Sequence, residues 1–483
     1  MWLFSGGGSN ASAVSHLRKD GSNESVTIPG GRCTGQGYTS APQVRLMNWH
    51  GWLRFQGQNQ GNTILKLKDR APGFTNPNCS INIDEREPRQ RCKAVLYAAS
   101  EISGDSTGAG EDAYDTDIQD LTIDTGRGNA GTVGLHWIGS NRAAVRNVTV
   151  RSGDGQGRAG VDLKSGSSGD GGGPALLKNL TVEGFDYGIT SGFNLEVGYT
   201  FEHITLRNQR IAGFLNQNLS AWIRDLRSQN TVPAVINRNT GAMTLLDSRL
   251  AGGSRANSAI LNQGEKRAGQ LFVRNVVVSG YAGAIRQGVG TGPRAGAIVA
   301  RSSRVDEYAF PGVKSLFDSR RVSMDLPIQE TPEYHNNDFS QWAIVTEYGA
   351  KPDDDADDSA GIQAALDSGK PVVFFPFGAY RIARTLHIPG SVRLIEGTNS
   401  QLSGAPRVAT VFACDAKTGG PIIVRDFNFD IETTGSPAIH NSCSVPFVMV
   451  DLFNVNRYVG DGGGDVFWEN CAITGVEQHG GRF

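Results

Sequence analysis

Long apolar runs and an excess of one charge are both missing from this chain of 483 residues. No apolar stretch approaches the roughly 18 residues that a membrane-spanning helix needs. Lys and Arg (46) nearly balance Asp and Glu (48), and the two signs are interspersed. We therefore expect neither a nucleic acid nor a membrane as partner, because an anionic partner needs a basic face or run.

Cysteine is scarce, and its spacing excludes the usual metal and redox motifs. The six cysteines form no CxxC pair, so a zinc site is not expected. Cys79 and Cys92 flank the polar segment "CSINIDEREPRQRC", which we interpret as a surface loop closed by a disulfide. The other cysteines are interpreted as small buried hydrophobic residues. These are Cys33, Cys414, Cys443 and Cys471.

A secretory leader is not visible in the first residues, "MWLFSGGGSNAS", which have no basic segment and too short an apolar core. Either a leader has been removed or the sequence is a fragment. Glycine, by contrast, is abundant. Its 63 residues are spread along the chain and do not form one linker, which favours many tight turns.

Two short phrases recur through the first 300 residues. The first is a β-type segment with Asn, Asp or His at its centre, as in "VRNVTVR" and "FEHITLR", and its centres lie 22 to 32 residues apart. The centres are Asp120, Asn147, Asn179, His203, Asp225, Asp247 and Asn275. The second is a small residue followed by an apolar one, with spacings of 21 to 28 residues. Its pairs begin at Gly134, Gly160, Gly188, Gly213, Ala234, Ala259 and Ala284.

Two interleaved strands per repeat, without a helical period between them, predict an all-β fold, a right-handed parallel β-helix. A propeller blade would need four strands in about 40 residues, and the leucine-rich repeat template does not hold. The apolar residue of the second phrase faces the interior, and the next residue faces outward because side chains alternate along a strand. Asn216, Asn237 and Asn262 fall at one further position and predict a ladder of side-chain amides inside a turn.

A pattern typical of the start of a domain appears at Tyr348, in "YGAKPDDDADDSAGIQAALDSGKPVVFFPFGAYRI". Its aspartates precede a segment with Ile362, Ala365 and Leu366 on one face, which predicts a short capped helix. A buried strand, a turn and another strand should follow. We interpret the aspartates as helix-capping and solvated residues and not as a calcium site, because a helix start does not make their oxygens converge.

This stretch resembles the N-terminal cap of the pectate-lyase-like superfamily of β-helix proteins. The match consists of Gly349, Ala350, Asp354, Asp357, Asp358, Ile362, Gln363, Ala364, Pro376, Gly378 and Tyr380. A second cap implies a second β-helix, whose coils centre on Asp426, Asp451 and Asn470. Since only about three coils are visible, we expect this unit to be truncated. The predicted organisation is an unassigned segment 1–24, a first β-helix 25–302, a linker 303–342 and a second β-helix 343–483.

Two capped β-helices in tandem resemble glycoside hydrolase family 55, exo-acting β-1,3-glucanases, and also bacterial polygalacturonase-related proteins. The resemblance implies a general acid on the second helix, for which Glu469 in "VFWENCAI" is the nearest candidate. Hydrolysis of a glycosidic bond normally needs two carboxylates. A crowded polar region on the first helix offers further candidates. They are Asp154, Arg158, Asp162, Lys164, Asp186, Tyr187 and Glu196.

Alignment of the repeats places His136 and Asp162 outward on adjacent coils, where they are predicted to form an acid/base pair. Each also has a structural alternative as a solvated charge, and Asp154 and Asp186 as turn residues. Trp137 and Trp222 are either sugar-stacking platforms or core. The predicted substrate-binding residues are Trp137, Lys164, Arg158 and Tyr187.

Three functions follow from these residues and the resemblance. The first is hydrolysis of a polysaccharide, with a β-glucan as one candidate, by carboxylate catalysis without a cofactor. The second is a polysaccharide lyase that acts on a uronate polymer, for which Lys164 or Arg158 with Asp154 and Asp162 would be tested and Ca²⁺ would be required. The third is a non-catalytic, tailspike-like module that binds glycans. Each implies a polysaccharide partner and a secreted or extracellular protein.

Overall fold

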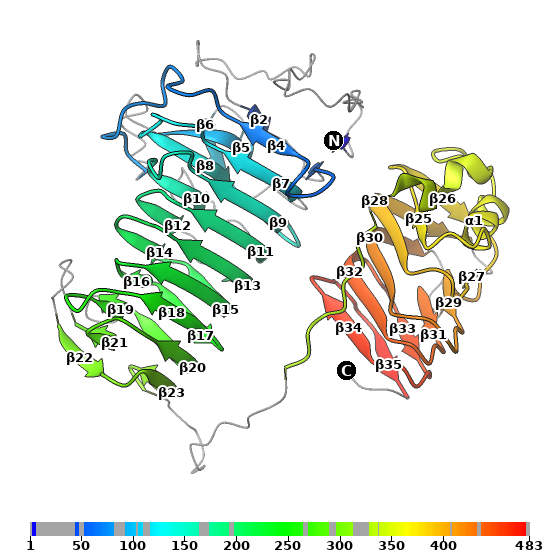
Figure 1. Ribbon diagram of the computed structural model, residues 1–483. Coiled ribbons are helices and arrows are strands. Elements are labelled where there is room, and N and C mark those ends of the chain that lie inside the picture. Colours follow the sequence, from blue (N-terminus) through cyan, green and yellow to red (C-terminus); the bar gives the residue numbers. More distant parts are fainter. Residues whose placement is uncertain are drawn as a thin grey trace. The chain divides into compact units, whose positions relative to one another are not determined.

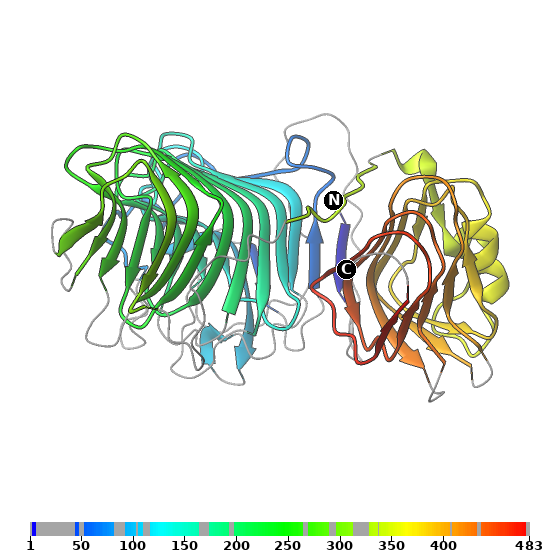
Figure 2. The same cartoon turned by 90° about the horizontal axis from the view of Figure 1, so that it is seen from below.

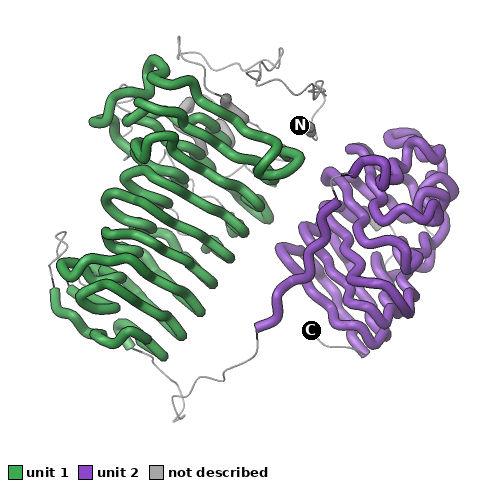
Figure 3. The backbone as a smooth tube through the Cα atoms, in the orientation of Figure 1, with its two compact units in different colours: residues 1–319 green, residues 320–483 purple. Residues whose placement is uncertain are grey.

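The computed structural model describes residues 2–5, 44–47, 53–81, 92–102, 105–109, 116–163, 173–192, 198–263, 269–288, 296–312, 328–336, 338–405, 408–431 and 436–479. It contains two compact units, residues 1–319 and 320–483 (Figure 3). Each unit is a parallel β-solenoid, so the predicted fold class is confirmed (Figure 1). The described part of the chain contains no helix long and apolar enough to cross a membrane.

The first unit consists of two long sheets, and between residues 117 and 238 successive strands along the chain alternate between them (Figure 2). The 12-stranded sheet contains β1 (Trp2–Ser5), β3 (Leu53–Gln56), β4 (Ile64–Lys66), β7 (Asp117–Asp124), β9 (Ala144–Arg151), β11 (Ala175–Glu183), β13 (Gly198–Arg207), β15 (Ser220–Asn230), β17 (Ala242–Leu246), β18 (Arg249–Gly252), β20 (Gln270–Val278) and β23 (Arg304–Phe310). The 11-stranded sheet contains β2 (Val44–Met47), β5 (Lys93–Ile102), β6 (Asp105–Ala109), β8 (Thr132–Trp137), β10 (Ala159–Leu163), β12 (Tyr187–Ser191), β14 (Ala212–Asn216), β16 (Val235–Arg238), β19 (Ser258–Gln263), β21 (Gly283–Gln287) and β22 (Ala297–Ala300).

The second unit repeats this plan on a smaller scale and begins with short helices. Its seven-stranded sheet contains β24 (Trp342–Ile344), β25 (Val372–Phe374), β26 (Ala379–Ile382), β28 (Leu394–Gly404), β30 (Ile422–Ile431), β32 (Phe447–Phe453) and β34 (Val466–Glu469). Its five-stranded sheet contains β27 (Leu386–Ile388), β29 (Phe412–Cys414), β31 (Ile439–Asn441), β33 (Tyr458–Gly460) and β35 (Val476–Gln478). The helices are the 3₁₀ turns η2 (Phe339–Gln341) and η3 (Val345–Tyr348) and the α-helix α1 (Ser359–Leu366).

The apolar stack predicted from the second phrase forms the core of the first unit. Leu135, Val161 and Ile189 lie opposite one another on β8, β10 and β12, and all three are fully buried. The residue at the centre of the first phrase has another role, because it adopts left-handed backbone, with φ between 49° and 59° from Asp120 to Asn275. Asn, Asp and His enter this region more readily than most side chains, which explains their recurrence there.

Asparagine ladders join successive coils at two places. Inside the first unit, Asn216 Nδ2 donates to Asn237 Oδ1 (3.0 Å) and Asn237 Nδ2 to Asn262 Oδ1 (2.9 Å), which confirms the predicted ladder. All three residues are buried. The left-handed centres make a second series of contacts, for example from Asn147 Nδ2 to Asp120 Oδ1 (2.9 Å). In both series a side-chain amide bonds the residue at the equivalent position of the neighbouring coil.

The cap of the second unit has the predicted helix, with Ile362, Ala365 and Leu366 buried on one face. Four of its aspartates, Asp353, Asp354, Asp355 and Asp357, are exposed as expected, and Asp358 differs. Asp358 is 4% exposed, and its carboxylate accepts from the backbone N–H groups of Lys351 (2.7 Å) and Arg381 (2.9 Å). It makes no side-chain hydrogen bond to its own helix. Asp358 therefore fixes the cap loop to β26, while Asp357 accepts from the N–H of Ser359 (2.9 Å).

The segment expected as a linker, 303–342, contributes to both units. β23 pairs antiparallel with β20 in the first unit, and Tyr334 and Trp342 pack on the second. The predicted Cys79–Cys92 disulfide is confirmed. A second disulfide joins Cys414 to Cys443, so the interpretation of these two residues as free buried thiols was wrong. Cys414 ends β29 and Cys443 follows β31 on the next coil, and only the stacking of coils brings them together.

Candidate functional site

The predicted acid/base pair lies on the outer face of the 11-stranded sheet. His136 on β8 is opposite Asp162 on β10, and His136 Nδ1 lies 3.6 Å from Asp162 Oδ2. The ring of Tyr97 on β5 stacks on the imidazole, with centroids 4.5 Å apart. On the other side, Thr190 Oγ1 on β12 donates to Asp162 Oδ1 (2.8 Å). Four neighbouring strands therefore each supply one side chain to a single polar row.

The expectation that these side chains are exposed was wrong, although their outward direction was right. His136 is 5% and Asp162 3% exposed. The same row continues as Leu215, Ile236 and Leu261, which form a separate apolar cluster outside the core. His136 Nε2 is buried and has no hydrogen-bond partner among the described residues. An imidazole whose Nδ1 faces a carboxylate and whose Nε2 is uncommitted has a nitrogen available for proton transfer.

Asp186 and Arg158 form a different group, at the turn that leads into the 11-stranded sheet. The Asp186 carboxylate receives Arg158 Nη1 on one oxygen and Arg210 Nη2 (2.6 Å) on the other. Asp186 is buried and Arg158 is partly buried. A carboxylate paired with a guanidinium group on each oxygen has both oxygens occupied, which suits it to fix the turn. Tyr187 follows directly and packs partly buried against the apolar clusters of the outer face.

Asp154 has the geometry of a turn residue. Its carboxylate accepts hydrogen bonds from Gly128 N (2.6 Å), Gln156 N (3.1 Å) and Ser152 Oγ (3.2 Å). Partial burial acts to raise the pKa of Asp154, but these hydrogen bonds outweigh it and lower the pKa below its ordinary value. An exposed carboxylate with a lowered pKa is a poor proton donor.

Trp137 belongs to the core and is not open to a sugar. Its side chain is fully buried, donates from Nε1 to the carbonyl of Thr116 (3.0 Å) and lies against Tyr199. Trp137 is two residues beyond the inward-facing Leu135, so strand alternation already places it inside. Lys164 and Glu196 lie outside the described residues. Glu469 ends β34 in the second unit and is partly buried.

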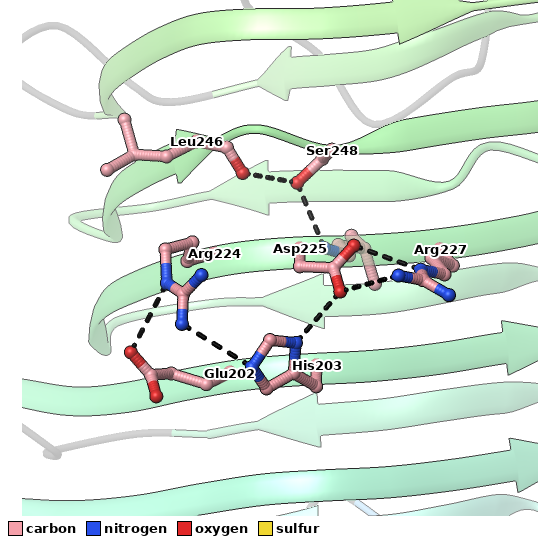
Figure 4. A network of polar contacts seen from close by, with 8 residues as sticks. Glu202, His203, Arg224, Asp225, Arg227, Leu246 and Ser248 are labelled. Carbon is pink, nitrogen blue, oxygen red and sulfur yellow. Dashed lines mark hydrogen bonds and ion pairs between the residues drawn. The ribbon is translucent and has the colours of Figure 1, made fainter. Parts of the chain in front are cut away.

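A polar network that was not predicted lies on the outer face of the 12-stranded sheet (Figure 4). Asp225 Oδ2 lies 2.8 Å from His203 Nδ1, and Arg227 donates to both oxygens of Asp225, each at 3.0 Å. Burial acts to raise the pKa of Asp225, but the hydrogen bonds from Arg227 and His203 lower it overall. Arg224 Nε lies 3.4 Å from Glu202 Oε1, and Arg224 Nη2 lies 3.4 Å from His203 Nε2.

This network was missed because His203 and Asp225 occupy the centre of the first phrase, where they were interpreted only as marks of the repeat. A signal was present in the sequence. Most centres are Asn or Asp, whereas position 203 is His, and its flanking residues carry charge in "FEHITLR" and "IRDLRSQ".

Comparisons with known proteins agree with the fold. Residues 342–444 match the family "Rhamnogalacturonase A/epimerase, pectate lyase-like". A glucan 1,3-beta-glucosidase of Cochliobolus carbonum is 22% identical over 324 residues, which cover 60% of this chain and 39% of the relative. A probable glucan endo-1,3-beta-glucosidase of Arthroderma benhamiae is 35% identical over 65 residues, 13% of this chain and 7% of the relative.

A third relative, the non-secreted LysM effector LysM19 of Penicillium expansum, is 28% identical over 152 residues, 26% of this chain and 12% of the relative. The matches span about two fifths of the length of the first relative and less of the other two. The fold places the chain in the class of parallel β-helix proteins, and its residues 342–444 match a pectate-lyase-like family. Within that class the chain resembles glucan 1,3-beta-glucosidases, which confirms the resemblance predicted from the cap and the tandem coils.

Proposed function

We propose that this protein is a glycoside hydrolase that cleaves a polysaccharide, with β-1,3-glucan as the first candidate substrate, and that it acts outside the cell. The similarity to two proteins named as glucan 1,3-beta-glucosidases supports the reaction class. The solenoid supports it too, because it holds side chains from successive coils in fixed rows at about 4.8 Å intervals, which suits a polymer.

The His136–Asp162 pair is the observation that carries the site assignment. Asp162 is fixed by Thr190 and faces His136 Nδ1, so it can orient the imidazole. His136 Nε2 then holds the proton that is exchanged with the glycosidic oxygen or with water. A second carboxylate completes the usual requirement, and Glu196 and Glu469 stay our candidates for it. Because His136 and Asp162 are buried, the proposal requires that a sugar displaces the side chains around them when it binds.

An activity panel of neutral and uronate polysaccharides tests the proposal. We expect new reducing ends from β-1,3-glucan without ultraviolet absorbance of unsaturated products. Asp162→Asn should lower kcat about 100-fold or more, since general acid/base groups contribute about 10²- to 10⁴-fold. Asp306→Asn is the matched control, because Asp306 is 84% exposed and paired only locally with Arg304.

Three outcomes would count against the proposal. Unsaturated products would indicate a lyase, and absence of turnover on every glycan would favour a binding module. Full activity of a folded Asp162→Asn variant would remove the His136–Asp162 pair from the mechanism while leaving the reaction class intact.

A further inference from the structure

Trp222 stands out on the outer face of the 12-stranded sheet because half of its side chain (50%) is exposed. It lies on β15, directly opposite Thr200 on β13 and Thr244 on β17. Phe272 on β20 follows Thr244 in the same row and is partly buried. An indole held on a sheet with half of its surface exposed presents a flat apolar face on which a ligand can stack.

Gly198 on the preceding coil determines how the indole lies. A Cβ atom at position 198 would be 1.7 Å from Trp222 Cζ3 and 1.9 Å from Cη2. The six-membered ring therefore rests directly on the backbone of β13, in space that only glycine leaves free. Because the neighbouring strand fixes the ring, stacking a ligand on it costs little side-chain entropy.

Polar groups of both signs lie beside the ring. Glu202 and Arg224 are opposite each other on β13 and β15, two residues further along the same face, and make the 3.4 Å contact described above (Figure 4). Their side chains are 24% and 15% exposed. The next pair along, Asp225 and Arg227, is also mutually neutralised. The surface around Trp222 thus presents donors and acceptors whose charges compensate each other.

We propose that this row is a binding site for a neutral polysaccharide chain that runs along the solenoid axis. A sugar ring has an apolar C–H face that stacks on an aromatic ring, and a rim of hydroxyls that Thr200, Thr244, Glu202 and Arg224 can bond. Trp222 and Phe272 are two strands apart, about 9.6 Å, so one chain reaches both. A uronate chain is disfavoured, because the guanidinium groups beside the ring already face carboxylates.

The inference rests on the proposed function for the nature of the polymer, but not for its cleavage. His136 and Asp162 belong to the other sheet of the same unit. The Trp222 site would therefore hold the polymer away from the reacting bond, and its loss should affect affinity for long chains.

Calorimetric titration of the full chain separates binding from turnover. The ligand is a soluble β-1,3-glucan oligosaccharide, and the Asp162→Asn background is chosen to slow its consumption. An oligogalacturonate serves as the charged comparison. We expect Trp222→Ala to weaken binding of the β-1,3-glucan about tenfold, the factor that corresponds to the stacking energy of one aromatic ring. Trp222→Phe should keep most of the affinity. Gly198→Ala should lower it, because the added Cβ displaces the indole.

Trp468→Ala in the second unit is the matched control and should leave binding unchanged, although Trp468 is also exposed (38%). Binding by Trp222→Ala equal to that of the parent would overturn the inference, as would a stronger loss for the oligogalacturonate than for the glucan. If neither glycan binds the parent while the wild-type chain still hydrolyses glucan, this site fails and the proposed function survives. If glucan binds through Trp222 but is never cleaved, the binding site is supported and the proposed hydrolase function fails.

Discussion

The two solenoid units carry different side chains at the same position of their long strands. In the first unit the outer row before the left-handed residue holds Thr200, Trp222 and Thr244. In the second unit the matching row holds Leu394, Ile423 and Val448, all of them buried. The same arrangement of stacked parallel strands therefore carries a polar, partly exposed outer face in one unit and an apolar, buried outer face in the other.

The apolar row of the second unit is covered in part by Tyr334, which precedes the first strand of that unit. Tyr334, Trp342 and Phe467 pack against the apolar row. The guanidinium carbon of Arg393 lies 5.1 Å from the centre of the Tyr334 ring, and Trp342 Nε1 donates to the carbonyl of Asn336 (3.0 Å). The segment 328–336 is thus bound to the sheet by an aromatic contact and an anchored indole, and it is not a simple tether.

The next outer row makes the comparison sharper, because both units have Glu on one coil and Arg on the following coil. Glu202 and Arg224 are 3.4 Å apart and partly exposed. Glu396 and Arg425 are 2.6 Å apart, and the Glu396 side chain is only 2% exposed. The two pairs have the same residue types in the same register, but removing one partner should cost them different free energies of unfolding. The cost rises with burial, because the remaining charge is then left without water around it.

The largest expected effect comes from removing the two arginines in parallel. Arg425→Met should destabilise the second unit by about 3 kcal/mol or more, because Glu396 loses this partner in a buried site. Arg224→Met should cost the first unit less than about 1 kcal/mol, as for partly exposed pairs. Hydrogen exchange followed by mass spectrometry reports each unit separately. Equal effects in the two units would contradict the role given to burial.

A smaller effect is expected at the inner asparagine ladder. Asn237→Ala removes bonds to Asn216 and Asn262 and leaves buried amide groups without a partner, which should cost about 2 kcal/mol. The second unit has one asparagine in the corresponding place, Asn441, which donates to Tyr458 Oη (2.9 Å). We expect protection to fall in β14, β16 and β19 together for Asn237→Ala, and only around β31 and β33 for Asn441→Ala.

The exposed Asn62→Ala variant is the control for the ladder and should change stability by no more than about 0.5 kcal/mol. A loss confined to β16 would mean that the amides act as separate bonds and not as a chain.

The smallest effect concerns pH and should have opposite signs in the two units. Asp225 has a lowered pKa in the folded state, so its contribution is present above the ordinary carboxyl pKa and is lost as pH falls through the lower folded value. Burial raises the pKa of Asp358 despite its two backbone hydrogen bonds. Folded Asp358 therefore holds its proton more tightly than the unfolded chain, and its contribution declines as pH rises from the ordinary value through the raised one.

Urea titrations between pH 3 and 7, read by exchange in each unit, test these signs. Asp225→Asn should flatten the acid-induced loss of stability in the first unit. Asp358→Asn should flatten the opposite slope in the second unit. Changes of the same sign in both units would show that hydrogen bonding, and not burial, governs Asp358.

The sequence predicted the features that repeat from coil to coil. In a solenoid each position lies over its equivalent on the next coil, so spacing alone aligned Leu135 with Val161 and Asn216 with Asn237. Strand alternation then set the direction of each side chain. It also places Trp137 inside, two residues beyond Leu135, so the prediction of Trp137 as a substrate-binding residue could have been avoided. The helix in the cap followed from the same kind of local pattern.

Only the tertiary structure decided whether an outward side chain meets water. His136 and Trp222 both point away from the core, yet one is 5% and the other 50% exposed. Cover comes from segments distant in the sequence, as Tyr334 shows on the second unit, and no repeat encodes it. The Cys414–Cys443 disulfide has the same origin, since its partners meet only when the coils stack. Direction is a local property of a strand, whereas exposure depends on everything that packs above it.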